Sequence, residues 1–179
     1  GLPILLCCDF NVDPCVWEVA QTRGGVIRVV DELSMRDTNT MEMGREAVRR
    51  FAGHGAGITV YGDAAGMSRS TTGKSDYAIL AELGLGDQRV KRSNPHVKDR
   101  VNGLNAMLEN TNGRARLFHH PRCRMLRKDL ETVEWREGGA AIDKSNNDRT
   151  HAADALGYFI EYEFPLRSVR RDPSKRFYK

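Results

Sequence analysis

The opening run ILLCCDF (residues 4–10) constrains the fold more than any other stretch, because it is apolar at almost every position. A strand that alternates apolar and polar residues has one solvated face, whereas a continuous apolar run predicts a strand that is covered on both faces. Such a strand lies in the middle of a sheet with helices on both sides. The run also contains Asp9, a carboxylate at the end of the apolar segment ILLCC.

The rest of the chain supplies further strands and helices for such a sheet. CVWEVAQ and VIRVVDEL flank TRGG, a turn signal, and predict a hairpin over residues 15–33. In VKDRVNGLNAMLEN, Val97, Val101, Leu104 and Leu108 recur at helical spacing and predict an amphipathic helix. The remaining patterns predict helices over about 39–52, 75–83, 122–133 and 148–163, and strands over about 57–63, 88–92 and 115–120. This order predicts a single mixed α/β sheet flanked by helices.

Length and composition indicate a globular domain. At 179 residues the chain is long enough for one domain with a proper core. Hydrophobic residues make up 40% and charged residues 29%, and no run approaches the ~18 apolar residues of a membrane span. No charged segment precedes the opening run, so we do not expect a signal peptide. The four cysteines show no CxxC spacing, and reduced thiols in a cytosolic setting are the simplest expectation.

Positive charge is unevenly distributed along the chain. The formal net charge is only +4, yet PLRSVRRDPSKRFYK at the end carries six Lys or Arg residues against one Asp. Because Pro165 breaks a helix, we expect a folded domain over residues 1–165 and a basic tail over 166–179. Basic clusters of this kind suit a polyanion partner. A solvated surface with a disordered tail is the alternative that composition alone leaves open.

The stretch GDAAGMSRSTTGKS looks at first like a nucleotide-binding P-loop. A Walker A loop needs the pattern GxxxxGK[ST], because its backbone N–H groups must curl around phosphate at one loop length. Counting back from Lys74 places the first glycine at position 68, which is Ser68, and Gly66 is two residues too early. We therefore do not expect this chain to bind or hydrolyse ATP.

Three aspartates stand where a packed structure rarely leaves a carboxylate. Asp9 and Asp63 each end a predicted buried strand, and Asp154 lies among small and apolar residues of the last predicted helix. A buried carboxylate is costly unless it has a charged partner, a metal or a raised pKa. If the two strands are parallel neighbours, Asp9 and Asp63 lie at one carboxyl edge, where open α/β sheets place their ligands. With Asp154 from a crossing helix they form an oxygen-rich site suited to Mg²⁺ or Mn²⁺.

Each aspartate alone also has an ordinary structural explanation. Asp9 can be a strand-end turn residue, Asp63 an Asx-turn, and Asp154 a surface position on its helix. Spacing alone does not establish that the three converge. If they do, two cations held about 4 Å apart by carboxylates are suited to in-line attack on a phosphodiester.

Five blocks of this sequence carry a resemblance to a known family. They are CDFNVDP, YGDAAGMSRSTTGKSDYAIL, NPHVKDRVNGLNAML, HHPRCRMLRKDLETVEW and DKSNNDRTHAADALGYF, and they cover essentially residues 4–162. Together they resemble the C-terminal nuclease domain of the large terminase subunit of tailed bacteriophages and prophages. The resemblance implies an RNase H-like fold with an acidic site that maps onto Asp9, Asp63 and Asp154. Gly157 stands where the family's His-x-x-Asp-Ala-x-x-Tyr block often has a basic residue.

The resemblance also implies an activity and its partners. It implies a metal-dependent endonuclease that cuts concatemeric double-stranded DNA with two divalent cations, Mg²⁺ or Mn²⁺. In the expected assignment Asp9 and Asp154 hold one cation and Asp63 shares the second, with the bridging carboxylate left open. The family's ATPase motor lies N-terminal to the nuclease, so that domain, the portal and the small terminase subunit are implied partners. The implied location is the cytoplasm of the bacterial host, not the finished virion or a membrane.

Further residues are second-tier candidates. His151 lies three residues before Asp154 and can orient it or touch phosphate. Asp148 can contact a cation or complement a helix dipole, and Asp13 precedes a proline in a turn. HHPRC (residues 119–123) lacks a fourth ligand at suitable spacing for zinc. A path for DNA phosphates is expected along Arg69, Lys74, Lys91, Arg92, Lys98, Arg100 and Lys144.

Two other functions remain open at this point. Another RNase H-like nuclease, such as a junction resolvase or a transposase or integrase core, would use a similar set of carboxylates. Strand transfer to a target DNA, rather than hydrolysis, would distinguish an integrase core. A non-catalytic module that binds DNA or a portal would bind without cutting.

Overall fold

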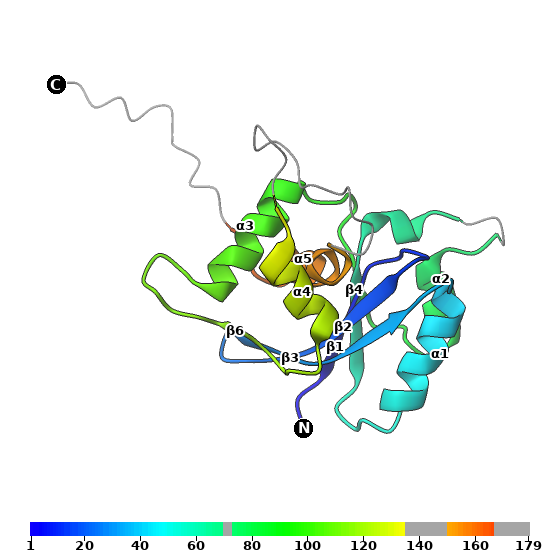
Figure 1. Cartoon of the computed structure of the whole chain (residues 1–179). Coiled ribbons are helices and arrows are strands. Elements are labelled where there is room, and N and C mark those ends of the chain that lie inside the picture. Colours follow the sequence, from blue (N-terminus) through cyan, green and yellow to red (C-terminus); the bar gives the residue numbers. More distant parts are fainter. Residues whose placement is uncertain (70–72, 135–149, 167–179) are drawn as a thin grey trace, which may run out of the picture.

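The computed structural model describes residues 1–69, 73–134 and 150–166. Its strands are β1 (Ile4–Cys8), β2 (Cys15–Arg23), β3 (Val26–Met35), β4 (Ile58–Gly62), β5 (Gln88–Arg89) and β6 (Leu117–His119). They form one six-stranded sheet in the order β5-β4-β1-β2-β3-β6 (Figure 1). β1 pairs in parallel with β4 and antiparallel with β2, and β2 and β3 form the predicted hairpin. The outer strands β5 and β6 run parallel to β4 and β3, so the sheet is mixed, as predicted.

Helices cover both faces of this sheet. They are α1 (Thr40–Phe51), α2 (Asp76–Glu82), α3 (Val97–Leu108), α4 (Arg124–Thr132) and α5 (His151–Glu163), with a short 3₁₀ helix, η1 (Ala64–Met67), after β4. α1 and α2 pack on one face, and α3, α4 and α5 pack on the other (Figure 1). Among the described residues, no helix is both long enough and apolar enough to cross a lipid bilayer.

β1 is shared by the two helical layers. Leu5 and Cys7 belong to the core under α3, α4 and α5, whereas Ile4, Leu6 and Cys8 belong to the core under α1 and α2. All five residues of the strand are buried. The prediction of a strand covered on both faces is therefore confirmed.

The structure differs from the predicted elements in detail. The buried face of α3 consists of Arg100, Gly103, Leu104 and Met107. Of the predicted apolar stripe only Leu104 is buried, and the other three residues, Val97, Val101 and Leu108, are half-buried. This buried face is the one on which α5 packs closely, since a Cβ at Gly103 would lie only 3.3 Å from the side chain of Ile160. η1 follows Asp63 directly and was not predicted. The last helix is described from His151, and residues 148–149 and 167–179 lie outside the described residues.

Glu32 of β3 sets the start of α4. Its carboxylate oxygens accept N–H bonds from Arg124, Met125 and Leu126 at 2.9–3.2 Å. These N–H groups have no partner inside the helix, and a negative charge complements the positive end of the helix dipole. One strand of the sheet thereby fixes the position of the helix that packs above it.

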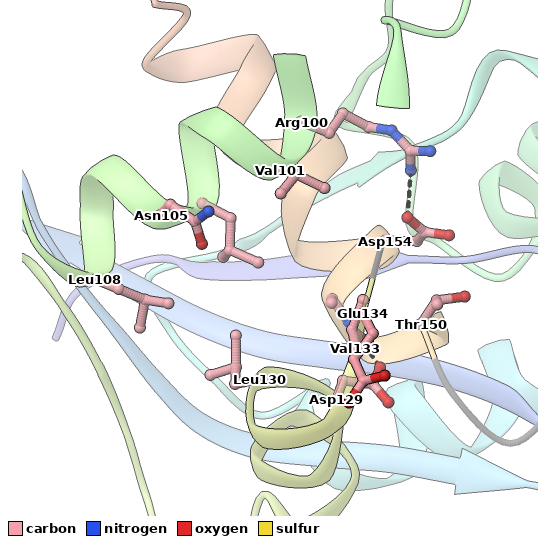
Figure 2. Close-up of a pocket in the computed structure, with 12 residues that line it drawn as sticks. Arg100, Val101, Asn105, Leu108, Asp129, Leu130, Val133, Glu134, Thr150 and Asp154 are labelled. Atoms are coloured by element: carbon pink, nitrogen blue, oxygen red, sulfur yellow. Dashed lines mark hydrogen bonds and ion pairs between the residues drawn. The ribbon is translucent and has the colours of Figure 1, made fainter. Parts of the chain in front are cut away.

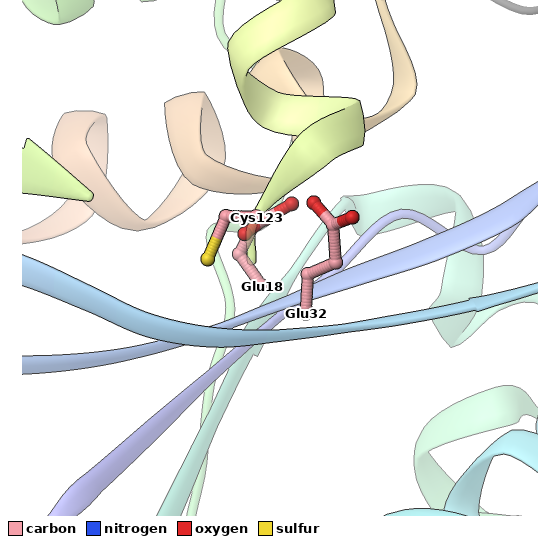
Figure 3. A group of neighbouring side chains, drawn as sticks. All are labelled: Glu18, Glu32 and Cys123. Atoms are coloured by element: carbon pink, nitrogen blue, oxygen red, sulfur yellow. The ribbon is translucent and has the colours of Figure 1, made fainter. Parts of the chain in front are cut away.

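Glu18 lies beside Glu32 but has no comparable partner. The two residues are opposite each other in the β2–β3 pair (Figure 3). Glu18 is fully buried. Neither carboxyl oxygen of Glu18 has a hydrogen-bond partner among the described residues. Burial, followed by the charges of Glu32, Asp129 and Asp31, raises the pKa of Glu18 well above its usual 4.5. The folded protein therefore keeps this proton at pH values at which the unfolded chain has lost it.

We predict that Glu18→Gln makes the free energy of unfolding less dependent on pH. Because the folded state binds a proton that the unfolded chain loses from pH 4.5 upward, wild-type stability falls as the pH rises toward the folded pKa. A glutamine cannot lose this proton, so the variant gains stability relative to wild type by up to about 1.4 kcal/mol per pH unit. Urea denaturation between pH ~5 and ~8 measures the difference. The control is Glu131→Gln, which changes an exposed glutamate. Parallel plots of unfolding free energy against pH for Glu18→Gln and wild type would contradict the prediction.

Candidate active site

Asp9 and Asp63 reach the same edge of the sheet because β1 and β4 are parallel neighbours. Cys8 is the register partner of Gly62, and each is followed directly by an aspartate. The expected parallel pairing of these two strands is confirmed. Neighbouring parallel strands end at one carboxyl edge of the sheet. The pairing of the strands therefore places the two aspartates at the same level, one at the end of each strand.

Asp154 approaches this edge from α5. It lies in the first turn of the helix, which contacts β1, β2 and β4. Buried Ala152, Ala155 and Leu156 surround it and hold the helix against the strands. Asp63 and Asp154 are only 6% and 8% exposed. We call Asp9, Asp63 and Asp154 the acidic edge.

Asp154 and Asp63 lie close enough to Asp9 to affect the pKa of its carboxyl group. Burial is the largest effect on Asp9 and raises its pKa above the usual 3.8. The charges of Asp154 and Asp63 also raise this pKa, whereas the hydrogen bond and the charge of His151 lower it. The edge thus carries excess negative charge that a bound cation would offset.

His151 is a partner of Asp9. Its Nδ1 lies 2.8 Å from Asp9 Oδ2, and the amide Nδ2 of Asn11 lies 3.4 Å from its Nε2. Asn11 also donates to the carbonyl oxygen of Pro14 at 3.2 Å, so the loop after β1 holds the imidazole in place. The sequence suggested that His151 orients Asp154 or touches phosphate, and the structure adds Asp9 as a hydrogen-bond partner of His151.

Asp63 is fixed by the short helix that follows it. Its Oδ1 accepts N–H bonds from Ala65 at 2.7 Å and Gly66 at 3.1 Å. The hydroxyl of Tyr77 donates to the carbonyl oxygen of Asp63 at 2.9 Å. A Cβ at Gly66 would lie 2.5 Å from the ring of Phe10, so only glycine lets η1 pack this closely. Asp63 is thus an N-cap residue and a member of the acidic edge at once.

Asp154 is paired with a buried arginine. Nη1 of Arg100 donates to Asp154 Oδ1 at 2.8 Å, and Arg100 is only 6% exposed. Its guanidinium carbon lies 4.4 Å from the centre of the Tyr158 ring. Figure 2 shows this pair at the rim of a cavity of about 120 Å³ between α3, α4 and α5.

Asp129 of α4 fixes the start of α5. Its Oδ2 accepts the N–H of Ala153 at 3.1 Å. Burial raises the pKa of Asp129, whereas the backbone N–H groups of Ala153, Thr150 and Ala152 lower it by less. Thr150 precedes the helix with a left-handed φ of 85° and makes no side-chain cap of its own. Asp129 therefore supplies the cap that α5 lacks. Because Asp154 lies in the same turn, Asp129 positions it indirectly.

The other predicted residues differ in their surroundings. Asp13 is half-buried and forms an ion pair with Arg36 at 3.2 Å. The basic residues Arg69, Lys74, Arg92 and Lys98 are exposed and Lys91 is half-buried, whereas Arg100 lies in the interior. On the surface, Lys74 pairs with Glu82 and Lys91 pairs with Glu161. Asp148 and Lys144 lie outside the described residues.

The acidic edge fits a divalent cation by its donor chemistry. It offers only carboxylate oxygens, which Mg²⁺ and Mn²⁺ prefer. Burial, and then the charges of Asp154 and Asp63, raise the pKa of Asp9. A tighter group among the described residues is Glu18, Glu32 and Cys123, whose ligand atoms lie within 4.8 Å of one another (Figure 3). However, Glu32 there binds the N-terminus of α4, whose dipole disfavours a cation. The acidic edge is therefore the better candidate for a metal centre.

Sequence reasoning missed three parts of this site: Asn11, the Asp129 cap, and the pairing of Arg100 with Asp154. For Asp129 a signal existed, because it stands three residues after Leu126 and so shares the inward face of its helix. Asn11 and Arg100 carried no such signal, because both residue types are ordinary on a surface.

Known proteins resemble this chain in sequence and in fold. The family model of the terminase RNaseH-like domain matches residues 9–163. No curated protein matches the chain in sequence. A large terminase of a thermophilic bacteriophage, solved with ATP-gamma-S, matches with a TM-score of 0.68 and 15% identity over 90% of this chain. The chain spans only 40% of that terminase.

Two solved nuclease domains match over most of their own length. The large terminase nuclease domain of bacteriophage SPP1 with bound Mn gives a TM-score of 0.62 and 16% identity, over 89% of this chain and 85% of that one. The large terminase nuclease of thermophilic phage G20c with bound magnesium gives a TM-score of 0.57 and 14% identity, over 90% of this chain and 80% of that one. The RNase H-like fold class predicted from the sequence is confirmed.

We predict that Asp129→Ala destabilises the protein by about 1–2 kcal/mol, because the N-terminus of α5 loses its cap. Asp129→Asn keeps one acceptor oxygen and should cost less. Urea denaturation measures both. Glu131→Ala is the matched control, since it changes an exposed carboxylate on the same helix and should stay within about 0.5 kcal/mol of wild type. Equal stability of Asp129→Ala and Glu131→Ala would show that the cap does not stabilise α5.

Proposed function

Because this chain belongs to the family of terminase RNaseH-like domains, we propose that it is the metal-dependent endonuclease of a viral DNA-packaging terminase. The observation that carries this proposal is the acidic edge, where β1, β4 and the first turn of α5 bring three carboxylates together. Its substrate in this proposal is concatemeric double-stranded DNA, and its reaction is phosphodiester hydrolysis.

The cofactors in this proposal are two divalent cations, Mg²⁺ or Mn²⁺, held by Asp9, Asp63 and Asp154. Manganese in the SPP1 domain and magnesium in the G20c domain support this choice. Such cations stabilise negative charge on phosphoryl oxygens and promote ionisation of a bound water. The chain's own residues make the site rigid before DNA arrives. His151 fixes Asp9, the N–H groups of η1 fix Asp63, and Arg100 fixes Asp154.

DNA binding in this proposal depends on the exposed basic residues. Arg69, Arg92 and Lys98 are exposed, and charges of this kind position the phosphate backbone without reading sequence. Lys74 and Lys91 would exchange their surface acidic partners for phosphates, and Lys144 lies outside the described residues. Contacts that depend on phosphate alone suit an enzyme that tolerates many sequences.

The wider assembly is also a proposal. Since the chain spans 40% of a solved large terminase, we propose an ATPase domain in the same assembly, with the portal and the small terminase subunit as further partners. The cytoplasm of the bacterial host is the proposed place of action, because DNA is cut during packaging and before the virion is complete.

We predict that Asp63→Asn lowers plasmid nicking in Mg²⁺ or Mn²⁺ by at least about 100-fold, because it removes a negative charge that would hold a cation. The amide oxygen of asparagine can still accept the N–H bonds of Ala65 and Gly66, so the fold should survive. Asp9→Asn should behave alike, and EDTA should stop nicking by wild type. Conversion of supercoiled plasmid to nicked circles measures the rate.

The matched control is Asp87→Asn, which changes an exposed aspartate just before β5 and should leave nicking unchanged. Wild-type rates in Asp63→Asn, or nicking that persists in EDTA, would refute the assignment of the acidic edge. DNA binding without any nicking would point to a non-catalytic module instead. Strand transfer to a target plasmid would point to an integrase-like core.

A further inference from the structure

Arg100 is an unusual residue for the interior, because long cationic side chains rarely lose contact with water. It extends from α3 across α5, and this path exists because residue 157 is glycine. A Cβ at Gly157 would lie 3.3 Å from the Cβ of Arg100. The guanidinium then stacks on Tyr158, one residue further along α5, and reaches Asp154 Oδ1. Asp154, Gly157 and Tyr158 of α5 thus together accommodate one arginine of α3.

The charges around the acidic edge show what this arginine balances. Asp63 is held by neutral backbone N–H groups, and Asp9 is held by a histidine. Arg100 is a permanently charged cation paired with Asp154, a member of the acidic edge. Its Nε is buried without a partner among the described residues, so the guanidinium is held mainly by Asp154 and the Tyr158 ring.

We propose that Arg100 is a resident positive charge that holds Asp154 in place before a divalent cation binds and competes with that cation for Oδ1. This inference rests on the proposed function, since it assumes that the acidic edge binds the cation. Arg100 is a positioning residue, because it acts through Asp154 and is too buried to meet DNA. It keeps the acidic edge assembled in the absence of metal and makes cation binding weaker and reversible.

Electrostatics gives the direction of the effect. A cation that takes an oxygen of Asp154 comes within a few ångströms of the guanidinium, and two like charges this close repel one another. The cavity of about 120 Å³ beside the pair leaves room for the guanidinium to shift, since one water occupies ~30 Å³. Figure 2 shows the cavity opening beneath the Arg100–Asp154 pair, toward α4.

The experiment compares Mn²⁺ binding by calorimetry in wild type and in Arg100→Gln, which keeps a hydrogen-bond donor but loses the charge. We expect Arg100→Gln to bind Mn²⁺ at least about tenfold more tightly, because the repelling charge is gone. Arg100→Lys keeps the charge and should restore the wild-type affinity. Arg89→Gln is the matched control, because Arg89 pairs with Glu163 at the opposite end of α5, and its affinity should equal that of wild type.

Thermal unfolding gives a second readout that does not depend on activity. In EDTA, Arg100→Gln should melt below wild type, because the buried carboxylate of Asp154 loses its counter-charge. Saturating Mn²⁺ should raise the melting temperature of this variant more than that of wild type, since the cation replaces the missing charge. A purely structural role would lower the melting temperature equally with and without Mn²⁺.

The outcomes separate this inference from the proposed function. If wild type binds Mn²⁺ and Arg100→Gln binds it equally or more weakly, the competition is refuted and the metal centre stands. If wild type and Arg100→Gln both fail to bind Mn²⁺, the proposed metal centre and this inference fall together.

Discussion

The in-register parallel pairing of β1 with β4 is the constraint on which the rest of this structure depends. It sets Cys8 beside Gly62, so that the next residue of each strand is an aspartate at the same edge of the sheet. A shift of one residue would turn one of the two carboxylates to the opposite face. The apolar residues of β1 prevent such a shift, because they alternate between two cores that are both filled. Packing on two faces therefore determines the geometry of the acidic edge.

A chain of carboxylate-to-helix contacts extends this constraint to Asp154. Glu32 of the sheet caps α4, Asp129 of α4 caps α5, and Asp154 lies in the first turn of α5. Each cap uses a charge to satisfy N–H groups that a helix leaves free. The cost of this arrangement is visible in Glu18, which is buried next to Glu32 with a strongly raised pKa. The position of the third carboxylate thus depends on polar contacts that cross three elements.

Much of the fold could be predicted from local patterns. The apolar run of β1, the hairpin of β2 and β3, and the helical spacing around Leu104 and Leu126 all correspond to observed elements. The three aspartates stood out because a carboxylate next to apolar residues is costly. The inward face of α3 was not predictable, because it includes Gly103, where α5 packs closely, and the sequence does not show which helices pack against each other. The same holds for His151, whose partner proved to be Asp9.

The sequence by itself determined the central strand, the mixed α/β sheet, and the three carboxylates, because hydrophobic periodicity and misplaced charges are local properties of a chain. Only the tertiary structure decided which partner each carboxylate has. Arg100 read as one basic residue among several, yet the close contact of α3 with α5 over Gly157 buries it against Asp154. A buried charge is costly unless hydrogen bonds or an opposite charge compensate it, and which group does so depends on how the helices pack rather than on the order of the residues.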